Sequence, residues 1–140
     1  MLYCKRKNSV NWQFPQGGID KNEDIFDAAL RELYEEVGIE ENKIKLIKES
    51  DNWYKYDLPN KYKRNSFLWE SFKGQKQKWF LFKLIEETKI DLNNENNPEF
   101  DEFNWVDYWK PLDEIVDFKR EIYEKVLTEL EPAYKSEFSK

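Results

Sequence analysis

The sequence predicts an α/β fold of the α+β kind, in which helices pack on a mixed sheet. Apolar residues recur with helical spacing in residues 24–37 and again in residues 117–130, and residues 79–85 form a short, bulky apolar run typical of a buried strand. Two helices with short strands between and around them are the pattern of a layered domain. Because 140 residues suffice for one core of ordinary size, we expect a single domain over residues 1–140.

The predicted strands are short and separated by turn signals. Pro15 and the pair Gly17 and Gly18 end the first of them, and the Asn-rich residues 93–97 separate two later ones. Residues 79–85 are almost uninterrupted by polar residues, so we expect that strand to be covered on both faces. Strands are expected at residues 12–14, 43–48, 79–85 and 103–106, a loop at 93–98, and strand fragments with a loop at 51–71.

Each of the two predicted helices has one apolar face. In the first, five apolar side chains fall within an arc of about 100° on a helical wheel, and Gly38 is placed to end the helix. In the second, Ile122, Val126 and Leu130 recur at i, i+4 and i+8. Both faces are expected to pack on the sheet. The apolar arc of the first helix consists of Phe26, Ala29, Leu30, Leu33 and Val37.

The residue types exclude several classes of enzyme. The chain has no histidine, which excludes Ser-His-Asp and Cys-His nucleophiles and nearly all zinc enzymes. Catalysis must therefore use carboxylates, lysines, tyrosines or a metal ion held by oxygen ligands. The net charge of −6 argues weakly against a nucleic-acid partner, although cations bunch locally, either as solvated surface or as a basic groove. These bunches are Lys5 to Lys7, residues 61–64, residues 73–78, and Lys119 with Arg120.

The N-terminal residues and the cysteine content favour a cytoplasmic protein. Lys5, Arg6 and Lys7 stand where a signal peptide needs an apolar run. The single cysteine, Cys4, allows no internal disulfide, which fits a reducing compartment. No run approaches the length of about 18 apolar residues that a membrane span needs, so we expect no membrane partner.

Three glutamates share one side of the first predicted helix. Glu32, Glu35 and Glu36 stand at i, i+3 and i+4, on an arc beside the apolar face. Carboxylates about 5–6 Å apart repel one another, and a divalent cation reverses that repulsion because Mg²⁺ and Mn²⁺ prefer hard oxygen ligands. Arg31, four residues before Glu35, is placed to hold that carboxylate in one rotamer. The plain alternative is a solvated acidic helix face.

The residues around these glutamates follow a longer pattern. Gly17, Glu23 and the run Arg31-Glu32-Leu33-Tyr34-Glu35-Glu36-Val37-Gly38-Ile39 resemble the Nudix box, in which these residue types recur at fixed spacing. The resemblance implies an α/β/α sandwich and hydrolysis of a nucleoside diphosphate linked to another moiety. It also implies two or three Mg²⁺ or Mn²⁺ ions, held by Glu32, Glu35 and Glu36, with a backbone carbonyl of Gln16 or Gly17 completing the site.

Outside the box, the chain is similar to the bacterial RNA pyrophosphohydrolase branch of this family, which is related to the dinucleoside polyphosphate hydrolases. Residues 12–19, 74–80, 98–101, 105–109 and 118–123 carry this similarity. It implies removal of pyrophosphate from the 5′-triphosphate end of RNA to leave a 5′-monophosphate, which initiates RNA decay. Two alternatives stay open: a dinucleoside polyphosphate (Ap4A-type) hydrolase, and a module that binds RNA 5′ ends with little activity. We expect a monomer that takes RNA or a dinucleotide and not DNA.

The same similarity assigns roles to residues outside the first predicted helix. Glu99 corresponds to a fourth acidic residue, a candidate metal ligand or general base; Glu35 and Glu36 are further candidates for the base, and the sequence does not rank the three. Phe118 and Lys119 correspond to a pair that meets the terminal nucleotide, with the ring on the base and the ammonium on phosphate. The alternative for Phe118 is a core aromatic. The predicted catalytic residues are Arg31, Glu35, Glu36 and Glu99, and those predicted to line the phosphate channel are Arg6, Gln75 and Lys78.

The N-terminal part departs from the pattern of this branch. Only 16 residues precede the box, whereas similar proteins begin with a further strand. Residues 1–4 fit the second strand, so we expect the first strand, roughly 5–6 residues long, to be missing. We expect its absence to leave a sheet edge without a partner.

Overall fold

The computed structural model describes residues 1–9, 11–15, 22–55, 76–94, 98–113, 115 and 117–138. The helices in this part of the chain are α1 (Ile25–Val37) and α4 (Asp117–Phe138), with short 3-10 turns η1 (Glu41–Lys43) and η2 (Lys110–Asp113). The strands are β1 (Leu2–Arg6), β2 (Trp12–Gln13), β3 (Ile44–Glu49), β4 (Tyr54–Lys55), β5 (Lys76–Gln77), β6 (Phe80–Leu84) and β7 (Phe100–Trp105).

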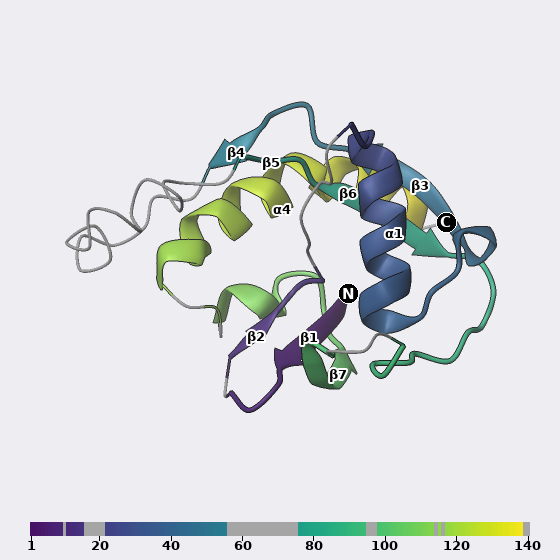
Figure 1. The fold of residues 1–140 in the computed structure, drawn as a ribbon. Coiled ribbons are helices and arrows are strands. Elements are labelled where there is room, and N and C mark those ends of the chain that lie inside the picture. Colours follow the sequence, from purple (N-terminus) through teal and green to yellow (C-terminus); the bar gives the residue numbers. More distant parts are fainter. Residues whose placement is uncertain are drawn as a thin grey trace.

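The strands lie between two helical layers. In Figure 1, α1 crosses in front of β3 and β6, and α4 runs behind them. Phe80 and Phe82 of β6 turn toward α1, where both rings contact Phe26 at centroid distances of 5.8 and 6.2 Å. Leu81 points to the other face, where it joins an apolar cluster with residues of α4. Because successive strand residues face opposite ways, β6 is covered on both sides, as the sequence predicted.

A second sheet has the same arrangement. β1 lies between β2 and β7, antiparallel to both. Cys4 of β1 is fully buried in a cluster with Val37 at the end of α1. Tyr3, the residue before it, packs instead in a cluster with Tyr123 and Leu127 of α4. The fold is therefore a layered α/β domain, and the predicted fold class is confirmed. The expected mixed sheet is not seen among the described residues, whose strand pairings are all antiparallel and form three separate sheets.

Local sequence explains where α1 begins and ends. Asp24 caps the helix, since its carboxylate accepts hydrogen bonds from the backbone N–H groups of Phe26 (3.0 Å) and Asp27 (3.3 Å). Gly38 ends it with a φ of +73°, a left-handed conformation that favours glycine. A Cβ at Gly38 would also lie 2.8 Å from the Cβ of Asp91. The predicted helix over residues 24–37 is confirmed, with its first residue acting as the cap.

α4 continues beyond the predicted end at residue 130. It runs through Pro132 to Phe138, although proline removes one backbone donor from a helix. The extra turns are held by ring contacts: Tyr134 lies 4.4 Å from Tyr108 and 4.7 Å from Phe138, measured between centroids. Aromatic packing from a distant turn therefore outweighs the local signal for a helix end.

The strand predictions are confirmed with shifted ends. β2, β3 and β6 fall on the expected segments, and β7 begins three residues earlier than residues 103–106 predict. β1 contains most of the residues expected to form the second strand. In the predicted region 51–71, β4 is described, and residues 56–71 lie outside the described part. Neither described helix has a stretch apolar enough to cross a membrane.

Candidate active site

The three box glutamates occupy different environments on α1. Glu36 is only 2% exposed and neighbours the buried Val37. It lies near Cys4 of β1, because two effects raise the pKa of the Cys4 thiol to about 12: burial, and then the charge of Glu36. Glu32 and Glu35 lie nearer the surface, with side chains 19% and 40% exposed. The set therefore spans from the core to solvent along one side of the helix.

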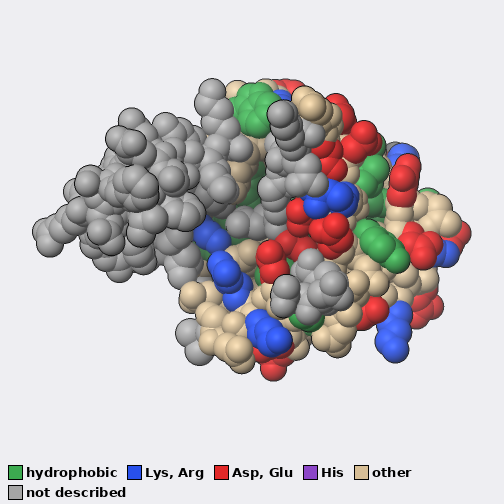
Figure 2. All heavy atoms as spheres, in the orientation of Figure 1, with side chains coloured by type: hydrophobic (Ala, Val, Ile, Leu, Met, Phe, Trp, Pro, Cys, Tyr) green, Lys and Arg blue, Asp and Glu red, His purple; other side chains and the backbone are tan. Residues whose placement is uncertain are grey.

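Arg31 binds three carboxylates at once. Its Nε and Nη2 donate to the two carboxylate oxygens of Glu23 at 2.8 and 2.9 Å, a bidentate pair. Its Nη1 donates to Glu32 at 2.8 Å and to Glu35 at 3.2 Å. The prediction that Arg31 holds Glu35 is confirmed, and the guanidinium also ties the segment before α1 to the helix. Figure 2 shows the resulting surface, with acidic side chains gathered over α1 and a cation among them.

The charges of the site act on Glu32. Burial raises the pKa of its carboxyl, the hydrogen bond and charge of Arg31 lower it, and the charges of Glu35 and Glu99 raise it again; the net shift is upward. Glu99, more than 60 residues away in sequence, therefore lies close enough to act on the same carboxylate. Repulsion among these carboxylates is the condition that a divalent cation relieves.

A divalent cation fits this donor set by its chemistry. Carboxylate oxygens are the hard ligands that Mg²⁺ and Mn²⁺ prefer, and the set has no soft donor except the buried, protonated Cys4. In the described residues, no three acidic or thiol side chains already converge as a metal cage. The guanidinium of Arg31 instead occupies the space among Glu23, Glu32 and Glu35.

The loop that carries Glu99 is fixed to the hairpin of β1 and β2. The backbone N–H of Lys7 donates to the Glu99 carbonyl oxygen at 2.8 Å. Two residues later, the carboxylate of Asp101 pairs with the Lys5 ammonium at 2.6 Å and accepts from the backbone N–H of Asn8 at 3.3 Å. These contacts hold the start of β7 at the end of β1.

Two of the predicted phosphate-binding cations lie together. Arg6 is exposed at the end of β1, beside a register shift between Lys5 and Arg6. Lys119, on α4, is partly buried, and its Nζ donates to the side-chain oxygen of Gln13 at 3.0 Å. Burial lowers the pKa of the Lys119 ammonium, and the charge of Arg6 lowers it further. Since that second effect acts over a short range, Arg6 of β1 and Lys119 of α4 lie within reach of each other's charge.

Lys78 is held elsewhere. Its ammonium donates to the backbone carbonyls of Ser50 at 2.6 Å and Asp51 at 3.2 Å, and it lies 5.5 Å from the centre of the Trp53 ring. Its side chain is 12% exposed. The contacts described for Lys78 therefore stabilise the turn after β3. Gln16, Gly17 and Gln75 lie outside the described residues, and for Phe118 only the backbone, within α4, is described.

Sequence reasoning missed the role of Gln13. It stands between Trp12 and Phe14, so strand alternation predicts a solvent-facing side chain, yet Gln13 is 3% exposed. Its partner Lys119 lies 106 residues away in the sequence, so no local pattern around Gln13 indicates the contact. The role of Glu23 was open to detection, because the motif places it eight residues before Arg31.

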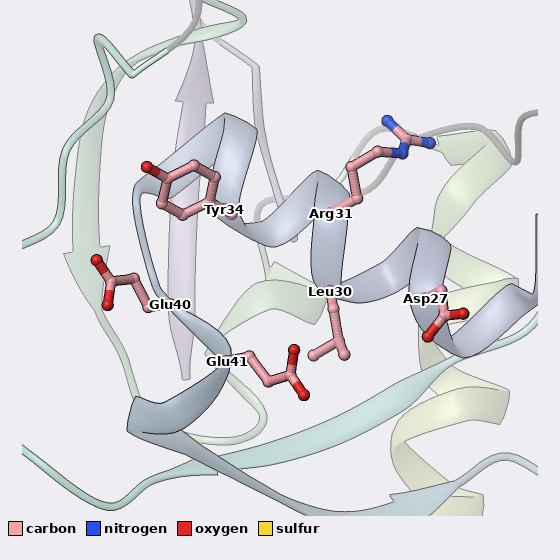
Figure 3. Close-up of a pocket in the computed structure, with 6 residues that line it drawn as sticks. All are labelled: Asp27, Leu30, Arg31, Tyr34, Glu40 and Glu41. Carbon is pink, nitrogen blue, oxygen red and sulfur yellow. The ribbon is translucent and has the colours of Figure 1, made fainter.

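A shallow pocket of about 370 Å³ lies beside α1, lined by Asp27, Leu30, Arg31, Tyr34, Glu40 and Glu41. In Figure 3, the guanidinium of Arg31 points away from Glu40 and Glu41. Its hydrogen bonds go to Glu23, Glu32 and Glu35 instead. The pocket and the carboxylate cluster therefore lie on different sides of Arg31.

Known proteins resemble the chain over most of its length. Residues 1–126 match the NUDIX domain. The RNA pyrophosphohydrolase of Francisella tularensis is 46% identical over 129 residues, which cover 91% of this chain and 82% of that protein. The RNA pyrophosphohydrolase of Haemophilus ducreyi is 43% identical over 130 residues, covering 92% of this chain and 66% of that protein.

Solved structures share the fold at lower identity. An Ap4A hydrolase binary complex from C. elegans superposes with a TM-score of 0.66 and 18% identity, over 94% of this chain and 85% of that one. The E. coli dihydroneopterin triphosphate pyrophosphohydrolase has a TM-score of 0.66 and 20% identity, over 91% of this chain and 84% of that one. At these identities the likeness concerns the fold alone.

Proposed function

This chain belongs to the NUDIX family, and on that premise we propose that it is a divalent-metal-dependent RNA 5′-pyrophosphohydrolase. In the proposed reaction, water attacks the phosphorus nearest the RNA, the bond to the next bridging oxygen breaks, and pyrophosphate leaves. The products are RNA with a 5′-monophosphate and free pyrophosphate. The observation that carries the proposal is the carboxylate set of Glu32, Glu35, Glu36 and Glu99, present in a chain 46% identical to an RNA pyrophosphohydrolase.

Glu32, Glu35, Glu36 and Glu99 would hold the metal ions. A backbone carbonyl of Gln16 or Gly17, which lie outside the described residues, would complete the set. When bound, two or three Mg²⁺ or Mn²⁺ ions would neutralise phosphate charge and supply a water acidic enough to attack near neutral pH. Arg31 would orient Glu32 and Glu35 through the hydrogen bonds described above.

Exposure favours two of the three candidates for the general base. A base must reach the attacking water directly or through one other water. Glu36 is 2% exposed and turned toward β1, which suits a ligand better than a base. Glu99 is exposed and lies on a loop tied to the hairpin, and Glu35 is 40% exposed. We therefore assign the proton transfer to Glu99 or Glu35.

Arg6 and Lys119 would receive the phosphates, because two neighbouring cations suit a polyanion. Phe118, one residue before Lys119, would stack on the terminal base, an interaction of about 1–3 kcal/mol for a free base on an aromatic ring. Gln75 and Lys78 would line the same phosphate channel. Lys78 would first have to exchange its contacts with Ser50 and Asp51 for phosphate.

Product analysis tests the proposal. The protein is incubated with 5′-triphosphorylated RNA and, separately, with Ap4A, each with Mg²⁺, with Mn²⁺ and with EDTA. We expect pyrophosphate and 5′-monophosphorylated RNA, no turnover in EDTA, and a higher kcat/KM for RNA than for Ap4A. Faster cleavage of Ap4A would reassign the substrate to dinucleoside polyphosphates, and tight binding without turnover of either compound would leave a binding module.

Two further expectations belong to this proposal. We expect the protein to act as a monomer. We also expect it in the cytoplasm, since its one thiol is buried and forms no internal disulfide that would need an oxidising compartment. Light scattering of the purified protein tests the first expectation, and fractionation of cells tests the second.

A further inference from the structure

The seam between β2 and α4 is made by two polar contacts from neighbouring residues. Lys119 Nζ donates to the side-chain oxygen of Gln13 at 3.0 Å. The Tyr123 hydroxyl, one helical turn along, accepts from the backbone N–H of Phe14 at 3.1 Å. Lys119 and Tyr123 stand at i and i+4, so they project from the same side of α4. The strand and the helix are therefore locked in register at this point.

The contact with Gln13 restricts the flexible side chain of Lys119. Gln13 is 3% exposed, so its amide is removed from water and its orientation is fixed by its surroundings. A lysine side chain has several rotatable bonds, and restricting it costs entropy. When a buried acceptor holds the ammonium in place, the lysine loses this entropy during folding and not during ligand binding.

The choice of glutamine also preserves the positive charge. The amide oxygen accepts a hydrogen bond but carries no formal charge, so this contact does not itself neutralise the Lys119 ammonium. Arg6 lies close enough for its charge to act on Lys119. Two like charges near each other repel. An anion that binds to both relieves this repulsion, which favours binding.

We propose that Gln13 is a positioning residue, whose side-chain oxygen fixes the Lys119 ammonium beside Arg6 so that the two cations form a preformed seat for the 5′-terminal phosphates. The inference deepens the proposed function and rests on it. Gln13 touches Lys119 and not the reacting atoms. Its contribution therefore belongs to substrate binding, in which ground state and transition state gain alike.

The test is a double-mutant cycle of Gln13→Met with Lys119→Met. Methionine is similar in length and unbranched, and lacks the amide acceptor. We expect Gln13→Met alone to raise the KM for 5′-triphosphorylated RNA about tenfold, with kcat changed less than about twofold. In the Lys119→Met background, the same change should alter KM less than about twofold, because residues that act through one contact are not additive. An equal effect in both backgrounds, or a loss confined to kcat, overturns the proposal.

Tyr123→Phe is the matched control. It removes the hydroxyl of the neighbouring contact and leaves Gln13 and Lys119 in place. We expect KM to stay within about twofold of the wild-type value. If Tyr123→Phe raised KM as much as Gln13→Met, loosening of the seam would account for both, and Gln13 would have no special role.

A second variant keeps the test open if Gln13→Met does not fold. Gln13→Glu preserves volume and an acceptor oxygen but places a negative charge beside Lys119. We expect weaker binding of 5′-triphosphorylated RNA and a salt dependence of Kd reduced by the equivalent of about one phosphate contact. Unchanged affinity and salt dependence would overturn the proposal.

Binding measurements separate this inference from the proposed function. Fluorescence anisotropy in EDTA compares 5′-triphosphorylated RNA with 5′-hydroxyl RNA of the same sequence. We expect Gln13→Met to weaken binding of the first and not of the second. A wild-type protein that binds but releases no pyrophosphate would overturn the proposed function alone. Intact turnover with no phosphate-dependent loss in Gln13→Met would overturn the positioning role alone.

Discussion

At the scale of single residues, the site depends on one cation and one buried anion. Arg31 spreads its guanidinium over Glu23, Glu32 and Glu35, while Glu36 points into the layer between α1 and β1. Arg31 is suited to this role because its planar fork makes two parallel bonds to one carboxylate and still has another nitrogen to donate. Both residues can be tested by changes that preserve size.

Glu36→Gln should abolish turnover and leave the fold intact. The amide has the same shape, and removing a negative charge from a buried position costs the core nothing in charge desolvation. We expect kcat/KM to fall well beyond tenfold, a barrier increase above about 1.4 kcal/mol, and the melting temperature without metal to hold or rise slightly. A variant that kept more than about a tenth of the wild-type rate would remove Glu36 from the set of central ligands.

Arg31→Lys should damage both stability and activity. Lysine keeps the charge but cannot make the bidentate pair with Glu23 and also reach Glu32 and Glu35. We expect a loss of about 1–2 kcal/mol in the free energy of unfolding by urea, and a drop in kcat/KM of more than about tenfold. Arg120→Lys, the same change on the exposed side of α4, is the control for stability. Equal effects of the two changes would show that the fork of Arg31 is not needed.

At the scale of elements, the end of α1 sets where its glutamates lie. Gly38 turns the chain in a left-handed conformation, and the backbone N–H of Asp91 donates to the Val37 carbonyl at 2.8 Å. The Asn94 side chain donates to the Tyr34 carbonyl at 2.8 Å. The segment before β7, which leads on to Glu99, therefore closes the last turn of the helix that carries Glu32, Glu35 and Glu36.

Gly38→Ala should destabilise the protein by about 1–3 kcal/mol, because a side chain there is strained at positive φ. The new Cβ would also meet the Asp91 Cβ at 2.8 Å, so the segment from Asp91 would have to move. Chemical denaturation measures the loss, with Glu40→Ala, at an exposed position two residues on, as the control. A stability equal to that of the wild-type protein would mean that the helix end adjusts freely.

Glu129 joins α4 to the turn between β3 and β4. Its carboxylate accepts from the Tyr54 hydroxyl at 2.6 Å, the Asp51 backbone N–H at 2.7 Å and the Asn52 side chain at 2.9 Å. Partial burial raises the pKa of the Glu129 carboxyl, but these hydrogen bonds outweigh it and the net shift is downward. A lowered folded-state pKa means that the charged form is stabilised by folding.

Glu129→Gln should therefore lower stability near neutral pH by about 1 kcal/mol. The wild-type advantage is fully present above the ordinary pKa of a glutamate and is lost as pH falls through the lowered folded value. Thermal melts at pH values from about 7 to about 3 should show the two proteins converge at the acid end. A difference that stays constant over that range would assign the loss to packing and not to the charge.

At the scale of the whole molecule, α4 carries the proposed phosphate-binding residue Lys119, and α1 carries three of the proposed metal ligands. Tyr123 and Leu127 of α4 belong to the cluster that contains Tyr3, and Ile122 and Val126 belong to the one that contains Leu81. The third cluster, around Cys4 and Val37, joins the end of α1 to β1 and β7. β1 contributes Tyr3 to the first of these clusters and Cys4 to the third, so this strand connects α4 with α1.

The parts of this architecture that depend on near neighbours were predictable from the sequence. Helical spacing and Gly38 define α1, and the fixed spacing of Glu23, Arg31 and Glu32 indicates their contact. Contacts that depend on distant residues were not. Lys78 finds the Ser50 carbonyl 28 residues away. No local pattern marks such a contact, because it exists only after the layers have packed.

The same limit applies to the length of α4 and to Gln13. Pro132 signals a helix end locally, but rings on Tyr108 and Phe138 hold the chain helical past it. The alternation of polar and apolar residues predicts an exposed Gln13, but in the folded protein this side chain is buried and contacts Lys119 of α4. Both departures have one physical cause: tertiary contacts of about 1 kcal/mol or more override local preferences of similar size.

The burial of Cys4 makes its thiol a probe of local opening in the protein. The thiol has no exposed surface, and its pKa of about 12 leaves it unreactive while the chain is closed. A thiol reagent can reach it only when β1 separates from α1, so the labelling rate at low reagent measures the fraction of molecules in which that layer is open. If the carboxylates bind Mg²⁺, labelling should slow when Mg²⁺ is added, and Glu36→Gln should abolish the slowing. Labelling that is fast and indifferent to Mg²⁺ would mean that this layer opens without regard to the site beside it.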